Sequence, residues 1–416
     1  MKSARRHHPL SQWLNESGTN RLRSDHPWLF RTNVNEKVLF ATDPGVVPLG
    51  YRVYFYSPRS EIRLRQFGPF LGEPVVHGLE NGQIVSDPTV FEKIWGAALE
   101  EHFHQTFLKK KSYVDGDKCF RWLFAESDST PGLVVDVFDR SVVAQIQSAP
   151  IEHFWGVLKK ALDRAFTRAT GTSAEWSEMR NMPVRKKEGL NVESLPPEKV
   201  DAAQWIRWNG FEWWMNPGGP QKTGGYLDQR DNHHAASAWA RRLNLKEAWD
   251  FCSFEGGFSL HLAKAGLRVE ALDQSASALA TLSRNAEKNG LRIQTTEADV
   301  FDELRRRHQE KRKTDLIVLD PPSFVRSRTD KDAAIRGLKE LNLRALHCLN
   351  PGGVLVTCTC SHHIAPYELD AILMEASHDS RTRLRVLERR GPAPDHAPLE
   401  GFPESNYLQA LYLEVV

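Results

Sequence analysis

Short apolar runs alternate with amphipathic segments along the second half of the chain, from about residue 201 onward. The runs have the length of buried strands, and the segments between them repeat apolar positions at helical spacing. The predicted strands are residues 248–252, 269–273, 293–298, 315–320 and 353–359, and the predicted helices are residues 257–265, 276–289, 300–311, 332–349 and 367–376. A series of this kind with short links forces parallel strands, right-handed crossovers and helices on both faces of the sheet.

Three further runs extend this pattern at its two ends. Residues 211–215 predict a short strand before the series, and residues 384–389 and 407–416 predict two more strands after it. We expect the last two to form an antiparallel edge pair. The second half of the chain is thus predicted to be an α/β domain with a mostly parallel sheet.

The first half of the chain has a different pattern, with strict alternation of apolar and polar residues near its beginning. Alternating runs with turn residues between them predict a small β-barrel or sheet, although residues 36–50 show no clear pair of strands. The runs are residues 51–56 and 62–67, followed by predicted helices at 90–110 and 151–168 and a hairpin of 132–138 with 142–146. The later elements predict a compact α+β middle domain.

Length and composition fit this division. A chain of 416 residues exceeds what one hydrophobic core usually sustains. We therefore expect a β domain at residues 1–75, a central α+β domain at 76–200 and the α/β domain at 201–416. Apolar residues make up 40% and charged residues 26%, as in soluble globular proteins. No apolar run reaches the roughly 18 residues of a membrane helix, so we expect no membrane partner.

The ends and the cysteines bear on location. Residues 1–14 are basic and rich in histidine, and they lack the apolar core of a secretory signal. Five cysteines without paired spacing do not suggest a disulfide framework. Both observations favour a reduced cytoplasm. We assign no metal site.

The net charge of +2 hides an uneven distribution. Residues 1–70 contain 11 Lys or Arg against 5 Asp or Glu, an excess of six. Arg63 and Arg65 would share one face of a strand, with Arg59 on the turn before it. A basic strand face beside aromatic residues suits RNA, whose phosphates need cations and whose unstacked bases need flat partners. The alternative is an ordinary solvated surface.

Paired glycines and acidic residues follow successive predicted strands. The first strand leads into Phe254-Glu255-Gly256-Gly257-Phe258, which lacks the second spaced glycine of a dinucleotide fingerprint. Gly256 and Gly257 allow a ligand close to the backbone, and the helix they open offers N–H groups to a carboxylate. S-adenosylmethionine carries such a carboxylate and no pyrophosphate. Asp273 would accept from its ribose hydroxyls and Asp299 from its adenine amino group.

The predicted donor site includes further residues at the same edge of the sheet. We place there Phe254, Glu255, Gln274, Asp320, Pro321 and Gln229.

A thiol and a carboxylate end the last two parallel strands. Asp320-Pro321-Pro322-Ser323-Phe324 follows one of them, and Thr357-Cys358-Thr359-Cys360-Ser361 closes the other. Since the carboxyl ends of parallel strands form the ligand crevice, these groups should meet in one methyl-transfer site. We expect Cys358 in the strand core and Cys360 beyond the strand end. Three cations on the loop beyond the Pro-Pro turn could hold a phosphate near a flipped nucleotide: Arg326, Arg328 and Lys331.

The chain resembles a known family along nearly its whole length. The motifs that carry the resemblance are His26-Pro27-Trp28-Leu29-Phe30, Tyr56-Ser57-Pro58, Glu126-Ser127-Asp128, Pro131-Gly132, Arg185-Lys186-Lys187-Glu188-Gly189, Lys222-Thr223-Gly224, Tyr226-Leu227-Asp228-Gln229-Arg230, Phe254-Glu255-Gly256-Gly257-Phe258, Asp320-Pro321-Pro322-Ser323-Phe324 and Cys358-Thr359-Cys360-Ser361. Together they resemble the RlmI-type cytosine-5 methyltransferases of bacterial large-subunit ribosomal RNA. One departure is Glu255, where this family more often has Thr.

The resemblance implies an N-terminal PUA-type RNA-binding domain, a central α+β domain and a Rossmann-like class I methyltransferase domain with a seven-stranded sheet. It implies S-adenosylmethionine as cofactor and RNA, ribosomal RNA above all, as partner. Cys360 matches the family's nucleophile position, and a thiolate there would attack carbon 6 of cytosine and so activate carbon 5. Asp320 would hold a proton at the ring nitrogen beside the exocyclic amine.

Two other functions stay open at this point. A methyltransferase acting on nitrogen could use the Asp-Pro-Pro-Ser-Phe turn to position an amine, with Cys360 as a bystander. A donor-binding RNA assembly factor without turnover is the other alternative. The sequence gives neither the modified nucleotide nor the oligomeric state, and a homodimer is possible.

Overall fold

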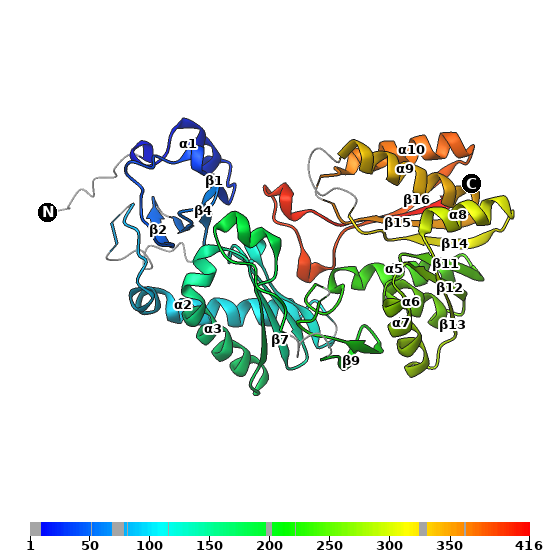
Figure 1. Cartoon of the computed structure of the whole chain (residues 1–416), viewed down its shortest axis with the longest axis horizontal. Coiled ribbons are helices and arrows are strands. Elements are labelled where there is room, and N and C mark those ends of the chain that lie inside the picture. The colour runs from blue at the N-terminus through cyan, green and yellow to red at the C-terminus, as the bar shows by residue number, and fades with distance from the viewer. Residues whose placement is uncertain are drawn as a thin grey trace. The chain divides into compact units, whose positions relative to one another are not determined.

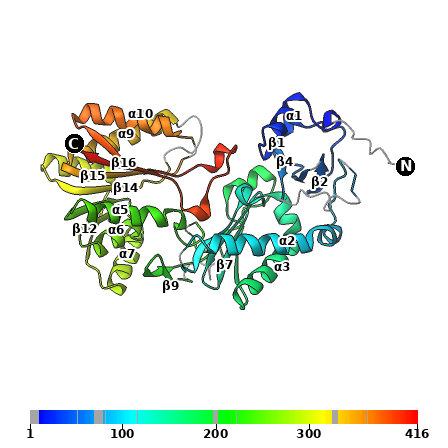
Figure 2. The same cartoon turned by 180° about the vertical axis from the view of Figure 1, so that it is seen from behind.

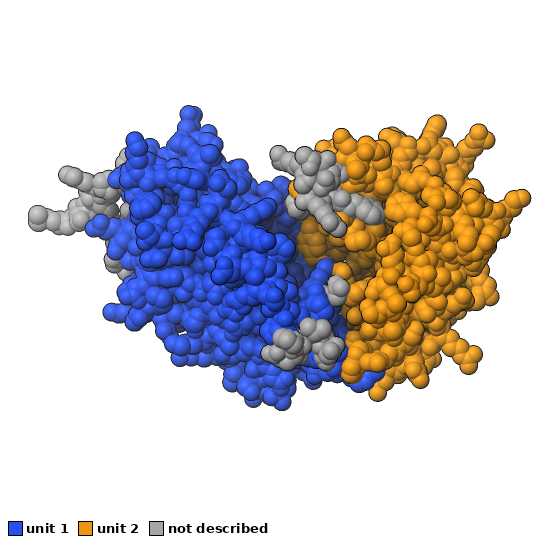
Figure 3. All heavy atoms as spheres, in the orientation of Figure 1, with its two compact units in different colours: residues 1–206, 215–225, 394–405 blue, residues 207–214, 226–393, 406–416 orange. Residues whose placement is uncertain are grey.

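The fold was analysed in a computed structural model, which describes residues 10–50, 52–68, 79–80, 82–114, 116–196, 202–220, 222–323, 331–361 and 363–416. The chain separates into two compact units, shown in different colours in Figure 3. Unit 1 contains residues 1–206, 215–225 and 394–405, and unit 2 contains residues 207–214, 226–393 and 406–416. Residues 1–75 and 76–200 thus share one unit, and three segments of the third predicted domain, residues 201–206, 215–225 and 394–405, belong to it as well. The division into three consecutive domains stays a prediction.

Unit 2 is built on a seven-stranded sheet with the order β13-β12-β11-β14-β15-β17-β16. The strands are β11 (Glu247–Phe251), β12 (Arg268–Asp273), β13 (Ile293–Glu297), β14 (Thr314–Leu319), β15 (Leu349–Thr359), β16 (Leu384–Arg390) and β17 (Gln409–Val415). The first five are parallel, which confirms the predicted fold class. The predicted antiparallel edge pair is confirmed, because β16 and β17 pair antiparallel at one edge of the sheet. The last strand, β17, is the inner member of the pair and also runs antiparallel to β15.

Helices cover both faces of this sheet (Figures 1 and 2). On one face lie α5 (Arg230–Arg242), α6 (Gly257–Lys264) and α7 (Ala276–Lys288), and on the other α8 (Val300–Gln309), α9 (Lys331–His347) and α10 (Pro366–Ser380). Strands covered on both faces have apolar residues without alternation, which is why the central runs are so uniformly apolar. Leu316 to Leu319 and Val354 to Val356 are almost fully buried.

Unit 1 contains two four-stranded sheets. The first has the order β1-β4-β3-β2, with β1 (Trp28–Phe30), β2 (Gly45–Leu49), β3 (Arg52–Tyr56) and β4 (Ile62–Gln66). The second has the order β5-β6-β7-β8, with β5 (Cys119–Phe124), β6 (Leu133–Phe138), β7 (Ser141–Ile146) and β8 (Glu175–Met179), and with the helices α2 (Pro88–Lys111) and α3 (Ala149–Thr170). The hairpin of β6 and β7 is confirmed. The strand β2 was missed within residues 36–50.

Shorter elements complete the two units. They are α1 (Glu16–Arg23), the paired strands β9 (Gln204–Trp208) and β10 (Phe211–Met215), and the 3₁₀ helices η1 (Leu10–Gln12), η2 (Arg31–Asn33), η4 (Ala125–Asp128), η5 (Pro183–Glu188), η6 (Leu227–Gln229), η8 (Pro394–His396) and η9 (Pro403–Ser405). Among the described helices, none combines the length and the hydrophobicity that crossing a membrane requires.

Three histidines lie together in unit 2, on α5 and α6. The ring centroids of His233 and His261 are 5.3 Å apart, and those of His234 and His261 are 4.8 Å apart. His233 and His261 are only 3% and 4% exposed. Burial lowers the pKa of His233 well below its ordinary value and that of His261 to about 3. Both rings are therefore neutral in the fold near neutral pH.

The two buried histidines predict a loss of stability in mild acid. Below pH 6.5 the unfolded chain binds protons that these rings in the folded chain do not, so the free energy of unfolding falls by up to about 1.4 kcal/mol per pH unit for each histidine. For His261 the loss should continue down to about pH 3. Urea unfolding of His261→Asn between pH 7 and pH 5 should show a shallower pH dependence than the wild type. The exposed His378→Asn is the control, and equal slopes for His261→Asn and the wild type would contradict this account.

Candidate active site

The ends of the parallel strands in unit 2 are aligned by the pairing of the sheet. Leu319 on β14 pairs with Phe251 on one side and with Thr357 on the other, and Phe251 also pairs with Leu272. The residues that follow these positions therefore stand at one edge of the sheet. This edge carries Asp273 and Asp320, with Cys360 just beyond it, as the sequence predicts.

The loop between β11 and α6 has a strained backbone. Cys252 and Phe254 have φ angles of 58° and 47°, in the left-handed region that residues other than glycine rarely adopt. Asp273 fixes this loop, because its Oδ2 accepts from the N–H of Phe254 at 2.9 Å. Its Oδ1 accepts from the N–H of Ser275 at 2.9 Å. A carboxylate has further lone pairs, so Asp273 can still accept hydrogen bonds from a ribose.

The paired glycines of this loop also serve packing, a role that the sequence does not reveal. A Cβ atom on Gly256 would lie 2.8 Å from Cγ of Leu282, and one on Gly257 would lie 2.4 Å from Nε2 of His233. Gly256 has a φ of 99° and precedes the first turn of α6. The two glycines therefore let α6 begin directly against buried side chains, with its first N–H groups at the end of the strained loop.

Two carboxyl groups near this loop have raised pKa values. Burial raises the pKa of Glu255 to about 7 and that of Asp250, on β11, also to about 7. The Oγ–H of Ser259 donates to Oδ2 of Asp250 at 2.6 Å. Asp250 was not predicted as a site residue, although an acid inside an otherwise apolar strand was a signal for it.

Asp299 and Gln274 bind each other after β13 and β12. Nε2 of Gln274 donates to Oδ2 of Asp299. Oδ1 of Asp299 accepts from the N–H groups of Phe301 and Asp302 at 2.8 and 3.1 Å, so Asp299 is the N-cap of α8. This cap accounts for an acid at this position without any ligand. A contact of Asp299 with adenine stays a prediction.

Asp320 and Cys360 lie beside the Pro-Pro turn. Nε2 of Gln229 donates to Oδ2 of Asp320 at 2.9 Å, and Sγ of Cys360 lies 4.0 Å from the carbonyl oxygen of Pro321. Cys358 is fully buried in β15, whereas Cys360 is half-buried after its end, as predicted. Burial raises the pKa of Cys358, so this thiol is inert near neutral pH.

Tyr226 is a site residue that the sequence reasoning missed. Its ring centroid lies 5.1 Å from that of Phe254 in an edge-on contact. Burial raises the pKa of its phenol, and the nearby Asp320 and Asp228 raise it further. The phenol therefore keeps its proton beside the carboxylate. Its place in the motif Tyr226-Leu227-Asp228-Gln229-Arg230 was the available signal.

The predicted RNA-binding residues of unit 1 need a correction. Arg63 and Arg65 share a strand face, but they are only 4% and 6% exposed. Arg63 pairs with Glu36, and Arg65 pairs with Glu188 at 2.6 Å. Both guanidinium groups therefore serve the interior of unit 1 and not an exposed face. Arg59 is exposed.

Of the three predicted phosphate-binding cations beyond the Pro-Pro turn, the structure describes one. Lys331 is described, and its Nζ lies 2.6 Å from Oε1 of Glu368 on α10. Arg326 and Arg328 lie outside the described residues. Their contact with a phosphate stays a prediction.

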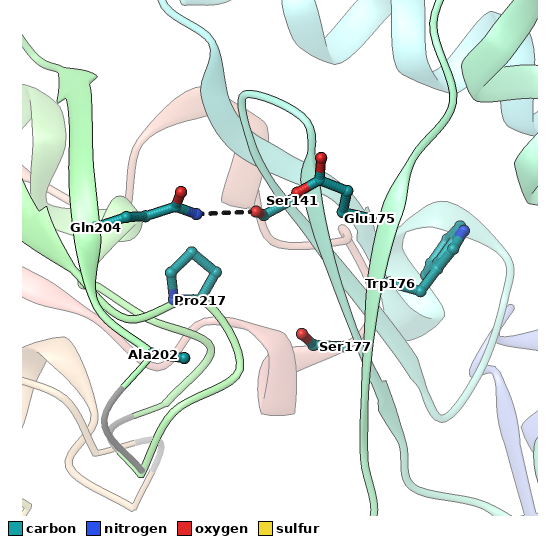
Figure 4. Close-up of a pocket in the computed structure, with 7 residues that line it drawn as sticks. All are labelled: Ser141, Glu175, Trp176, Ser177, Ala202, Gln204 and Pro217. Carbon is teal, nitrogen blue, oxygen red and sulfur yellow. Dashed lines mark hydrogen bonds between the residues drawn. The ribbon is translucent and has the colours of Figure 1, made fainter. Parts of the chain in front are cut away.

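A polar hollow of about 310 Å³ in unit 1 was not predicted (Figure 4). Its lining residues are Ser141, Glu175, Trp176, Ser177, Ala202, Gln204 and Pro217. Nε2 of Gln204 donates to Oγ of Ser141 at 3.1 Å across it. Among these lining residues there is no cation for a phosphate and no thiol.

The strand order of unit 2, the acid after its second strand and the glycine-opened helix after its first define a class I methyltransferase. The family model described as Methyltransferase small domain matches residues 237–383, which lie within unit 2. Two solved structures share the fold over 97% of this chain and 99% of theirs, with TM-scores of 0.73: a proposed methyltransferase in complex with SAH, 16% identical, and a proposed SAM-dependent methyltransferase from Streptococcus mutans, 17% identical.

Relatives in sequence are similar along the whole chain. Ribosomal RNA large subunit methyltransferase I of Photobacterium profundum is 31% identical over 415 residues, which cover 98% of this chain and 95% of that protein. The protein of the same name from Vibrio cholerae is 31% identical over 421 residues, which cover 95% and 96%. The chain belongs to the family of ribosomal RNA large subunit methyltransferase I, and its cofactor is S-adenosylmethionine.

The buried pair of Arg65 and Glu188 predicts a large effect on stability. Glu188→Ala would leave the buried guanidinium without its nearest carboxylate, which should cost about 3–5 kcal/mol of unfolding free energy. Lys160→Ala is the matched control, because its pair with Glu92 is exposed and should contribute below about 1 kcal/mol. Urea unfolding followed by circular dichroism measures both. Equal losses in the two variants would refute this assignment.

Proposed function

We propose that this chain methylates carbon 5 of a cytosine in RNA, with large-subunit ribosomal RNA as the substrate, through a covalent adduct with Cys360. The observation that carries the proposal is the position of Cys360, half-buried past the end of β15 with its sulfur 4.0 Å from the Pro321 carbonyl oxygen, next to Asp320. The names of the relatives support the RNA substrate.

Carbon 5 of cytosine is a poor nucleophile until addition at carbon 6 breaks the aromaticity of the ring. The Cys360 thiolate forms a bond to carbon 6, and carbon 5 becomes an enamine-like centre that can accept a methyl group. S-adenosylmethionine supplies that methyl group when it is bound. Loss of the carbon 5 proton and breakage of the bond between sulfur and carbon 6 then restore the ring.

Asp320 assists by proton exchange with the ring. Addition at carbon 6 moves negative charge onto the ring nitrogen beside the exocyclic amine, and a proton from the Asp320 carboxyl neutralises it. Pro321 and Pro322 fix the backbone that carries this carboxyl. Besides burial, Asp320 and Cys360 both contribute to the raised pKa of the Tyr226 phenol, so we place Tyr226 in the same proposed base site.

The donor would bind at the edge of the sheet next to this pair. Asp273, with free lone pairs on a carboxylate fixed by Phe254 and Ser275, would hold the ribose. The first N–H groups of α6 would hold the donor carboxylate. Phe254 and Glu255 in that loop, and Gln274 directly after β12, would complete the proposed donor site.

The proposal also covers the RNA-binding module, the oligomeric state and the location of the protein. The first four-stranded sheet would be the PUA-like RNA-binding module, with the exposed Arg59 as its cation. A homodimer and a cytoplasmic location also stay predictions.

The cysteine mechanism predicts a separation between donor binding and turnover. Cys360→Ala should abolish methyl transfer to ribosomal RNA from a strain that lacks the enzyme, while donor binding measured by calorimetry stays within about threefold of the wild type, because the thiol contacts the base and not the donor. Mass-spectrometric mapping of the RNA identifies the methylated atom. Cys358→Ala is the control and should remain active, since that thiol lies within the sheet.

The competing proposal is methylation of a nitrogen by the Asp-Pro-Pro turn, with carbonyl oxygens of the backbone as acceptors for an amine. Full turnover of Cys360→Ala would favour it and contradict carbon methylation.

Asp273 predicts a complementary loss. Asp273→Asn keeps the size of the side chain but replaces one acceptor by a donor, so it should weaken donor binding at least about tenfold, through the loop and through the ribose. Calorimetric titration with S-adenosylhomocysteine measures this. An unchanged affinity would remove Asp273 from the donor site.

A further inference from the structure

Asp320 ends a chain of side-chain hydrogen bonds that lies entirely within unit 2. The chain runs from Arg390 at the end of β16, through Asn232 on α5, to Gln229 in η6, and we name these three residues the amide relay. Gln229 and Asn232 are 3% and 0% exposed. Because water does not reach these amides, their partners are the ones that the fold supplies.

The direction of the amide relay is fixed at its far end. An arginine side chain only donates hydrogen bonds, and Nε of Arg390 lies 3.2 Å from Oδ1 of Asn232. The Asn232 oxygen must therefore face Arg390. Its Nδ2 then donates to Oε1 of Gln229 at 2.6 Å and to the carbonyl oxygen of Gly391 at 3.2 Å. A carbonyl oxygen only accepts, so Gly391 fixes the same orientation independently.

The orientation of Asn232 fixes that of Gln229. Since Oε1 of Gln229 accepts from Asn232, its Nε2 must point the other way, and it donates to Oδ2 of Asp320 at 2.9 Å. An N–H group at Oδ2 disfavours a proton on that oxygen. The amide relay by itself therefore favours Oδ1 as the oxygen that carries a proton.

We propose that the amide relay is a positioning device that keeps the Asp320 proton on Oδ1, the oxygen that serves the ring nitrogen of the substrate base. This rests on the proposed function. The ring nitrogen of cytosine beside the exocyclic amine only accepts, so the carboxyl must donate to it. When the thiolate adds at carbon 6, the proton passes from Oδ1 to the ring nitrogen, and the N–H of Gln229 stabilises the carboxylate that remains. Elimination returns the proton to Oδ1.

A double-mutant cycle tests the amide relay. In Asn232→Asp both side-chain oxygens can only accept. One of them keeps its hydrogen bond from Arg390, and the other accepts from Nε2 of Gln229. The Gln229 amide is then flipped, so that its Oε1 faces Asp320 in place of the N–H. The single-turnover rate of methyl transfer should fall on the order of 100-fold, as for loss of one aimed donor. In a Gln229→Leu background no amide is left to turn, so Asn232→Asp should cost less than about threefold more. Equal losses in both backgrounds would overturn the proposal.

Donor affinity separates positioning from folding. Calorimetric titration of Asn232→Asp with S-adenosylhomocysteine should match the wild type within about threefold, and loss of binding would count against a positioning role. Asn342→Asp is the matched control, since Asn342 is also fully buried in unit 2 and, among the described residues, its side chain donates to the Leu338 carbonyl oxygen of its own helix α9. Its rate per donor-bound enzyme should be unchanged. A loss as large as that of Asn232→Asp would overturn the proposal.

The identity of the methylated atom distinguishes this test from that of the proposed function. If wild-type product proves to be methylated on nitrogen, carbon methylation fails, together with the step from Oδ1 to the ring nitrogen. If the product is 5-methylcytosine and the two substitutions are additive, the amide relay fails and carbon methylation stands.

Discussion

The parallel register of β11, β14 and β15 is the constraint on which the site depends. Phe251, Leu319 and Thr357 stand side by side, so the loops that follow them emerge at one edge. A slip of one residue would turn every side chain of a strand to the opposite face. Helices pack on both faces, so such a slip would force each buried side chain into a space shaped for another, and the loss of close packing opposes it. The positions of Asp320 and Cys360 are thus set by hydrophobic burial rather than by contacts with a ligand.

Polar contacts then orient the groups that burial has placed. In unit 2, the carboxylate of Asp228 accepts from the hydroxyl of Tyr407 at 2.7 Å, and its carbonyl oxygen accepts from the N–H of Ala393 at 2.8 Å. The chain passes between the units next to these residues, at 225–226, 393–394 and 405–406. Asp228 therefore links its own segment to those of Ala393 and Tyr407 by hydrogen bonds. Its neighbour in the sequence, Gln229, donates to Asp320.

The sequence predicts the strand ends of unit 2 well, because apolar runs and helical spacing mark both neighbours of each turn. It predicts the shared face of Arg63 and Arg65 but not what covers it, since Glu188 lies 123 residues beyond Arg65. The same limit applies to the order of the two closing strands, which the sequence predicts as a pair but does not order. Strand order depends on pairing between distant segments, and nothing in the run that forms β17 indicates that it enters between β15 and β16. The amide relay escaped prediction for the same reason, because it joins residues 158 and 91 positions apart.

The central claim is a bond between one sulfur and carbon 6 of a cytosine. RNA that carries 5-fluorocytosine tests it most directly, because fluorine at carbon 5 cannot leave as a proton and the adduct should persist after methyl transfer. Mass spectrometry of the enzyme incubated with this RNA and S-adenosylmethionine should show a covalent complex, and digestion should place the methylated nucleotide on Cys360. A complex attached elsewhere, or methyl transfer to this RNA without any complex, would contradict the account.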